Sequence, residues 1–326
     1  MPVAAAKVDN VLFEDQHPVP SDSRAELLTG LQKKQKEVNP KYFYDARGSE
    51  LFEQITRLDE YYPTRTEIAI LQRHAAEMAR ICGPDCVLIE PGSGSSEKVR
   101  LLLNSLRPAA YVPLDISASF LYESAVKLAR EFPWLQVQAI CADFSNAWHA
   151  HTELPAGRRV IFYPGSTIGN MEPSVAQDFL ADLRRWIGAD GGVLIGVDLH
   201  KSEALLNAAY NDARGVTAEF NLNILNAINR VAEADFDTQR FSHRAIYNRQ
   251  LQRIEMHLVS EVGQTVRVDD NVINFHKGET LHTENSYKYT IEGFTELIEA
   301  AGFSLQKSWL DEEQLFSVHF LSVASR

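Results

Sequence analysis

Short apolar segments alternate with amphipathic ones between residues 66 and 200, a rhythm that few folds can accommodate. The apolar segments are rich in Val and Ile and occupy residues 86–92, 109–115, 135–144, 158–165 and 191–199. Continuous apolar runs of this length are typical of strands buried on both faces, and the stretches between them have helical periodicity. The sequence therefore predicts an α/β fold in which a doubly wound parallel sheet is covered by helices on both faces.

The alternation stops after Asp198, and further strands that could complete the sheet follow only near the C-terminal end. At 326 residues the chain is long enough for two structural units. An amphipathic helix is expected through residues 27–38, and a loosely ordered arm at 1–19. We predict a sheet domain and a second, discontinuous α+β domain, formed by residues 66–200 with 291–326 and by 20–65 with 201–290.

The chain is acidic, with 32 Lys and Arg against 44 Asp and Glu and a formal net charge of -12. Nucleic-acid binders normally present a basic surface that displaces counterions, so a small or cationic substrate is favoured over nucleic acid. No apolar run approaches the roughly 20 residues of a membrane-spanning helix, and the first residues resemble neither a signal nor a transit peptide. We expect a monomeric, cytoplasmic protein without a membrane partner.

Three cysteines occur, Cys82, Cys86 and Cys141. An odd and low number does not fit a disulfide framework, and the first two lack the second paired cluster of a typical structural metal site. We therefore expect buried thiols and no bound metal.

A glycine loop follows the first strand of the alternating region, where Gly92 and Gly94 lead directly into a helix. The carboxyl ends of strands are where an open α/β sheet binds its ligand. A dinucleotide loop would carry a third glycine at the position of Glu97, and a phosphate-binding loop would carry Gly-Lys-Ser or Gly-Lys-Thr. Both patterns are absent, which disfavours a ligand bound through its pyrophosphate.

S-adenosylmethionine carries no phosphate, and three strand ends offer the groups it needs. A helix N-terminus or Lys98 can bind its carboxylate, and Asp115, at the end of the second strand, can accept the ribose hydroxyls. Asp143 and Phe144 follow the third strand, where an acid and an aromatic edge can hold adenine. Each aspartate alone could be a helix cap. The three positions together favour the nucleoside cofactor.

Aromatic side chains are dense between residues 42 and 62, where they alternate with acidic and basic ones. This density is typical of a hydrophobic core and equally of the wall of a small polar pocket. Residue pattern alone leaves both interpretations open.

Longer motifs add a resemblance to a known family. They read YFYDARGSELFEQITRL, EYYPTR, EPGSGSSEK, IFYPGSTIGN, AYNDARGVTAEFN and TENSYKY. Over nearly the whole chain the sequence resembles the L-histidine Nα-methyltransferases of ergothioneine biosynthesis. The resemblance implies a Rossmann-like methyltransferase sheet, S-adenosylmethionine as methyl donor, and a second domain that closes over L-histidine.

The resemblance also implies roles for individual residues of this chain. The cofactor would be held by Gly92, Lys98, Asp115, Asp143 and Phe144. The residues around the reacting nitrogen would be Tyr44, Phe52 and Gly165. The substrate carboxylate would be bound by Asn170 and Tyr210, and the imidazole would be contacted by Tyr61, Glu284 and Ser286 with Met256 packed beside it.

Each substrate residue also has a structural interpretation. Tyr210 could be a core aromatic, Asn170 a helix cap, and Glu284 a solvated strand residue paired with Lys288. Two other functions stay open: methylation of another amino acid or amine, and cofactor binding without catalysis.

The reaction implied by the resemblance is direct displacement at the sulfonium methyl by the neutral α-amino nitrogen. Alignment of the two reactants is then the main contribution of the protein. The ammonium group must lose a proton before it reacts, with water or a phenol such as Tyr44 as relay. Three successive transfers would give the trimethyl betaine, hercynine.

Overall fold

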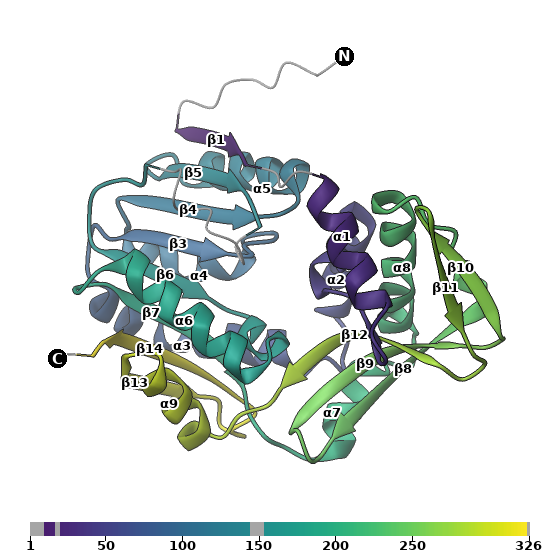
Figure 1. Ribbon diagram of the computed structural model, residues 1–326. Helices are drawn as coiled ribbons and strands as arrows, with labels where there is room; N and C mark the ends of the chain where they lie inside the picture. Colours follow the sequence, from purple (N-terminus) through teal and green to yellow (C-terminus); the bar gives the residue numbers. More distant parts are fainter. Residues whose placement is uncertain (1–9, 17–19, 144–152, 325–326) are drawn as a thin grey trace.

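The computed structural model describes residues 10–16, 20–143 and 153–324 (Figure 1). Phe144, expected at the cofactor, lies outside these residues. No helix in the described part of the chain is long and apolar enough to cross a bilayer.

The central sheet has the strand order β1-β5-β4-β3-β6-β7-β14-β13. The six strands β1, β5, β4, β3, β6 and β7 run parallel, whereas β14 is antiparallel to both β7 and β13. Their bounds are β1 Val11–Asp15, β5 Gln136–Cys141, β4 Ala110–Asp115, β3 Val87–Pro91, β6 Arg159–Tyr163, β7 Gly192–Asp198, β14 Phe316–Val323 and β13 Phe303–Leu310. All five strands expected between residues 86 and 199 are present, so the prediction of a parallel sheet is confirmed.

Helices cover both faces of this sheet. One face is packed against α3 (Tyr62–Cys82), α4 (Glu97–Leu106) and α5 (Ala118–Glu131), and the other against α6 (Pro173–Ile187) and α9 (Ile291–Ala300). Alternate residues of one strand enter different cores, as Leu88 does on one face and Ile89 on the other. The doubly wound α/β fold is thereby confirmed. Cys82, Cys86 and Cys141 are buried thiols, as expected.

The strand order reverses at β3, which lies between β4 and β6. From β3 the chain proceeds outward through β4 and β5, and it then returns to add β6 and β7 on the other side. The connections from β3 and β6 therefore leave in opposite directions. This switch point opens a crevice at the carboxyl ends of the two strands.

A second unit packs beside these carboxyl ends (Figure 1). Its sheet has the order β2-β12-β9-β8, with a separate β10-β11 hairpin. Its helices are α1 Pro20–Leu31, α2 Ala46–Ile55, α7 Glu203–Tyr210 and α8 Val216–Val231, with short 3-10 turns at Pro40–Phe43 and Thr238–Arg240. Its strands are β2 Lys36–Glu37, β8 Phe241–Asn248, β9 Arg253–Ser260, β10 Gln264–Val268, β11 Asn271–Phe275 and β12 Thr280–Tyr287. Residues from both stretches of the chain share one hydrophobic core, in which Phe43 stacks on Phe220 with ring centroids 4.5 Å apart.

Residues 11–15 correct the expectation of a loosely ordered arm at 1–19. They form β1, which pairs with β5 from Val11 opposite Val137 to Asp15 opposite Cys141. Phe13 packs edge-on against Tyr122 of α5, with ring centroids 5.4 Å apart. The apolar side chains of Val11 and Phe13 pack against the core on this face, and the segment adds a parallel edge strand to the sheet. Residues 1–9 and 17–19 lie outside the described residues.

The prediction of a helix through residues 27–38 is wrong beyond Leu31, where α1 ends. The chain turns back on itself, and β2 pairs with β12 through Lys36 and Glu37. A side chain at Gly30 would lie 2.4 Å from the Glu37 carbonyl oxygen, so glycine is needed for this close return. Strand pairing with a partner distant in sequence overrides the local helical preference here.

Candidate functional site

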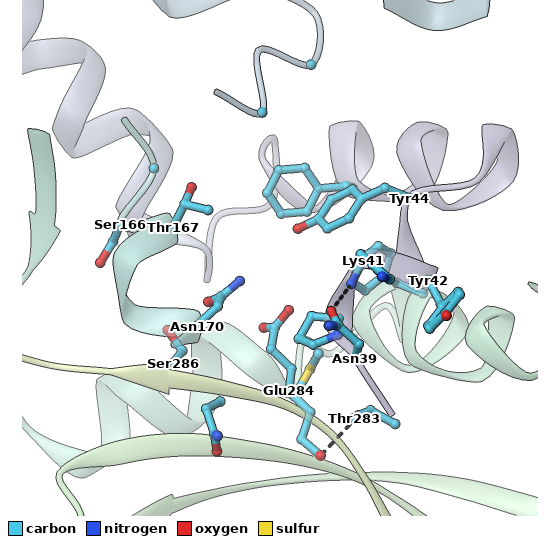
Figure 2. A pocket seen from close by; sticks show the side chains of 18 of the residues that line it. Asn39, Lys41, Tyr42, Tyr44, Ser166, Thr167, Asn170, Thr283, Glu284 and Ser286 are labelled. Carbon is cyan, nitrogen blue, oxygen red and sulfur yellow. Dashed lines mark hydrogen bonds between the residues drawn. The ribbon is translucent and has the colours of Figure 1, made fainter. Parts of the chain in front are cut away.

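A cavity of about 960 Å³ lies between the carboxyl ends of the central strands and the second unit. Side chains from both units line it (Figure 2). The structure brings together at this cavity every expected site residue that it describes: Tyr44, Phe52, Tyr61, Gly92, Lys98, Asp115, Asp143, Gly165, Asn170, Tyr210, Met256, Glu284 and Ser286.

The glycine loop and Asp115 form one end of the cavity. Gly92 and Gly94 have φ angles of 71° and 52°, which a side chain would disfavour. The Asp115 carboxylate accepts the Gly94 and Ser117 N–H groups, each at 3.0 Å. Burial raises the pKa of Asp115, while these backbone N–H groups act in the opposite direction. Each carboxylate oxygen can accept a further hydrogen bond, so the group fits a ribose diol.

Glu67 of α3 is a buried residue of this site that the sequence reasoning missed. Its carboxylate lies 2.6 Å from Lys98 Nζ and accepts the Gly165 N–H at 2.9 and 3.0 Å. A Cβ at Gly196 would lie 2.0 Å from the Glu67 carboxylate, so the glycine in β7 makes room for it. Glu67 thereby holds Lys98 and the loop after β6 in fixed positions.

Glu90, near the end of β3, is a buried carboxyl group on the cavity wall. It accepts the Tyr111 hydroxyl, and burial raises its pKa to about 8. An additional positive charge in the cavity would favour its ionised form.

Asp143 lies where adenine is expected, and it pairs with a residue of the second unit. Its Oδ2 atom is 3.1 Å from Lys41 Nζ, and the same ammonium is 2.6 Å from Glu26. Lys41 belongs to the 3-10 turn Pro40–Phe43, so the ion pair joins the two units at the edge of the cavity.

A row of aromatic rings forms one wall of the cavity. Ring centroids are 5.8 Å apart for Tyr44 and Phe52, 6.4 Å for Phe52 and Tyr61, and 6.2 Å for Tyr61 and Tyr210. Burial raises the pKa of all three phenols well above its ordinary value, so they remain neutral. The rings belong to the core of the second unit and also face the cavity, so both interpretations of this aromatic segment apply.

The opposite wall is formed by the paired strands β9 and β12. Glu284 lies directly across from Met256, and the register shifts between His282 and Glu284. Thr283, at this bulge, donates to the Met256 carbonyl oxygen at 3.0 Å. Figure 2 shows the Glu284 carboxyl directed into the cavity, near Asn170 and Tyr44. Burial raises the pKa of Glu284 to about 7, and the charge of Lys288 partly offsets this.

Tyr210 and Ser286 make a polar corner beside Glu284. The Tyr210 hydroxyl donates to Ser286 Oγ at 2.8 Å. Lys288 Nζ donates to Ser286 Oγ at 2.7 Å and to the Tyr210 hydroxyl at 3.2 Å. The ion-pair partner of Lys288 is Asp198, at 2.7 Å. The alternative that Glu284 is paired with Lys288 is therefore wrong.

Asn170 ends the 3-10 helix η3 (Thr167–Asn170) that follows β6. Glu172 occupies the N-cap position of α6, so Asn170 is not the cap of that helix. Its amide is directed into the cavity (Figure 2). Beside it, a Cβ at Gly169 would lie 2.8 Å from the Tyr287 carbonyl oxygen, so glycine allows η3 to approach β12.

No group of three or more His, Cys, Asp or Glu side chains suited to a metal ion occurs in residues 10–16, 20–143 and 153–324. The described side chains instead suit an organic cation that carries a nucleoside. Asp115 offers acceptors for hydroxyl groups, Lys98 offers a charge for a carboxylate, and Glu90 offers a carboxyl for a cation. These residues fit S-adenosylmethionine.

Comparison with known proteins agrees with this chemistry. A family model described as "Histidine-specific methyltransferase, SAM-dependent" matches residues 23–323. Histidine N-alpha-methyltransferase of Mycobacterium tuberculosis is 44% identical over 93% of this chain and 94% of that protein. The protein of the same name from Mycolicibacterium smegmatis is 41% identical over 89% of this chain and 93% of that protein. Ergothioneine biosynthesis protein 1 of Neurospora crassa is 30% identical over 86% of this chain but only 32% of that protein. The chain belongs to the family of histidine-specific, S-adenosylmethionine-dependent methyltransferases.

Proposed function

We propose that this protein methylates the α-amino nitrogen of L-histidine with S-adenosylmethionine as donor, a step of ergothioneine biosynthesis. The observation that carries the proposal is the half-buried Glu284 carboxyl, which is directed into the same cavity as the glycine loop and Asp115. The names of the mycobacterial relatives support the same reaction.

On the cofactor side, Asp115 would accept the ribose hydroxyls and Lys98 would bind the carboxylate. Asp143 would accept the adenine amino group, in place of its contact with Lys41. S-adenosylmethionine supplies an electrophilic methyl group on a sulfonium. Glu67 holds Lys98 and Gly165 in place, so the loop after β6 presents a fixed surface where the methyl group is transferred.

On the substrate side, one group of residues would bind the imidazole and another the carboxylate, and together they would orient the α-amino nitrogen. Glu284 would accept an imidazole N–H, with Met256 packed against the ring, and Tyr210 and Asn170 would donate to the carboxylate. The α-amino nitrogen would then face Tyr44, Phe52 and Gly165. Holding both reactants in line contributes about 7–11 kcal/mol toward lowering the barrier.

The amino group must lose a proton before each transfer, because an ammonium group has no lone pair. The pKa of the Tyr44 phenol is raised well above its ordinary value by burial, with the nearby Glu284 carboxyl adding to the effect. A neutral phenol can hold the nitrogen through a hydrogen bond but is a poor sink for a proton. Water in the cavity is therefore our candidate for the acceptor.

The test is to incubate the protein with S-adenosylmethionine and each amino acid in turn, and to follow the products by mass spectrometry. We expect histidine to be methylated and its trimethyl form to accumulate. Faster turnover of another amino acid or amine would support the alternative substrate. Binding of S-adenosylhomocysteine without turnover of any amine would support a cofactor-binding protein without catalysis.

A further inference from the structure

Lys288 follows β12, and its side chain is 0% exposed. Its ammonium group contacts Asp198 Oδ2 and Ser286 Oγ, both at 2.7 Å, and the Tyr210 hydroxyl at 3.2 Å. An ammonium has three N–H donors, so these three acceptors use all of them. Lys288 therefore links the end of a central strand to two hydroxyl groups on the cavity wall.

Asp198 has a second cationic partner. Lys201 Nζ also pairs with this carboxylate, at 2.5 Å, and the Tyr62 hydroxyl donates to both of its oxygens. Both lysine side chains are almost completely buried, at 0% and 4% exposure. Asp198 is therefore shared between two lysines, and the Glu284 carboxyl is a further acidic group near Lys288. The Lys288 ammonium next to Tyr210 attracts an anionic group on the ligand that Tyr210 contacts.

The hydrogen bonds at Ser286 also have a direction. A hydroxyl group has two lone pairs and one hydrogen. Lys288 and the Tyr210 hydroxyl both donate to Ser286 Oγ, so its two acceptor positions are filled. The remaining Ser286 O–H can only donate, and Ser286 lines the cavity.

We propose that Lys288 is a positioning residue that makes the Tyr210 and Ser286 hydroxyls hydrogen-bond donors toward the substrate. This inference rests on the proposed function and names the residue that orients two of its substrate-binding hydroxyls. Lys288 donates to both oxygens, so the hydrogens of both hydroxyls point away from the ammonium. When the substrate carboxylate binds, the Tyr210 hydrogen turns from Ser286 Oγ to the carboxylate, while Ser286 donates to an unprotonated ring nitrogen and Glu284 accepts an N–H on the other side of the ring.

The test replaces Lys288 with Met, which keeps an unbranched chain without the ammonium. Asp198 retains Lys201 and Tyr62, so its charge is not left unpaired. We expect the KM for histidine to rise about tenfold or more, with a much smaller change in kcat, because the lost hydrogen bonds come from a charged ammonium that orients both hydroxyls. The Kd for S-adenosylhomocysteine should stay within about twofold of the parent value, since this corner is separate from the glycine loop. If Lys288→Met does not fold, Lys288→Gln replaces it.

The matched control is Tyr62→Phe, which removes another donor to Asp198 but leaves Lys288 and both cavity hydroxyls in place. It should leave the KM for histidine unchanged. A double-mutant cycle with Ser286→Ala then tests the route of action. If Lys288 acts through Ser286, the rise in KM for the double variant will be clearly smaller than the product of the two single effects.

Three outcomes would overturn the inference. They are an unchanged KM for histidine in Lys288→Met, independent effects of the two substitutions on KM in the double-mutant cycle, or a loss of affinity for S-adenosylhomocysteine as large as the rise in KM for histidine. Each of these can be observed while the parent protein methylates histidine. Failure of the parent protein itself to methylate histidine would instead refute the proposed function.

Discussion

The Glu67 carboxylate lies 2.6 Å from Lys98 Nζ and accepts the backbone N–H of Gly165, so one side chain joins α3, α4 and the loop after β6. Gly165 has a φ angle of +82°, and a Cβ there would lie 3.3 Å from Lys98 Nζ. The three residues therefore constrain one another. Their relationship leads to the first prediction.

Glu67→Ala should lower the free energy of unfolding by about 1–3 kcal/mol, because it leaves a buried N–H and a largely buried ammonium without their acceptor. Glu67→Gln keeps an oxygen that can accept the Gly165 N–H, so it should lose less. Urea denaturation of the two variants and the parent measures the difference. Equal stability of all three proteins would show that this carboxylate does not hold the loop.

Asp115→Ala should weaken cofactor binding by about 1.5–3 kcal/mol, because it removes the carboxylate that we propose as acceptor for the ribose hydroxyls. Calorimetric titration with S-adenosylhomocysteine measures this loss. Asp178→Ala, at an exposed position of α6, is the matched control and should bind as the parent does. Unchanged affinity in a folded Asp115→Ala protein would rule out the assignment of Asp115.

Glu284→Ala should sharply reduce the preference for histidine over phenylalanine, because the acceptor for the ring N–H is lost. Sites built around a polar partner reject analogues that leave it unpaired. We expect the ratio of kcat/KM values for the two amino acids to fall by a factor of about ten or more. Binding of S-adenosylhomocysteine serves as the control and should be nearly unchanged. A constant ratio would mean that Glu284 does not contact the imidazole.

Histidinamide should be a far poorer substrate than histidine, because Tyr210 and Asn170 would face a neutral group. In Tyr210→Phe the advantage of histidine should shrink, since one donor to the carboxylate is gone. Initial rates with both compounds, in the parent and in the variant, measure this effect. Equal turnover of the two compounds by the parent protein would contradict carboxylate binding at this corner.

The stability of Glu284→Gln relative to the parent should increase with pH. Burial raises the pKa of Glu284 from 4.5 to about 7 in the folded protein. Between these values the folded state binds more protons than the unfolded state, so the carboxyl costs stability as pH rises. The glutamine does not titrate, and other groups cancel in the difference. Denaturation curves across this range measure it, and a difference that does not vary with pH would show that the carboxyl is not buried.

Much of the central sheet could be predicted because its signal is local. Five strands lie within the expected segments, and the stretch of helical periodicity between the second and third of these segments forms α5. In the second unit the polar and apolar residues of β8 alternate weakly, and this strand was not predicted. The bulge near Thr283 also has no local signal, since it depends on pairing with β9.

The site could be predicted where its residues belong to long motifs, but not where a buried charge acts across the fold. Glu67 lies in a helical stretch that reads as ordinary amphipathic sequence, and its partner Gly165 is 98 residues away. Lys288 lies within a recognised motif, but its contact with Asp198 spans two units. A buried charge of this kind can be identified only when its partner is known.

Gly169 has a consequence for how the two reactants meet. The backbone of η3 touches the backbone of β12 at this glycine, with the cofactor-binding sheet on one side and the strand that carries Glu284 on the other. A single methyl group at this contact would push η3 and β12 apart, and a histidine bound by β12 as we propose would shift relative to the cofactor. The absence of a side chain at Gly169 therefore sets the spacing between the two halves of the site, although Gly169 does not itself line the cavity.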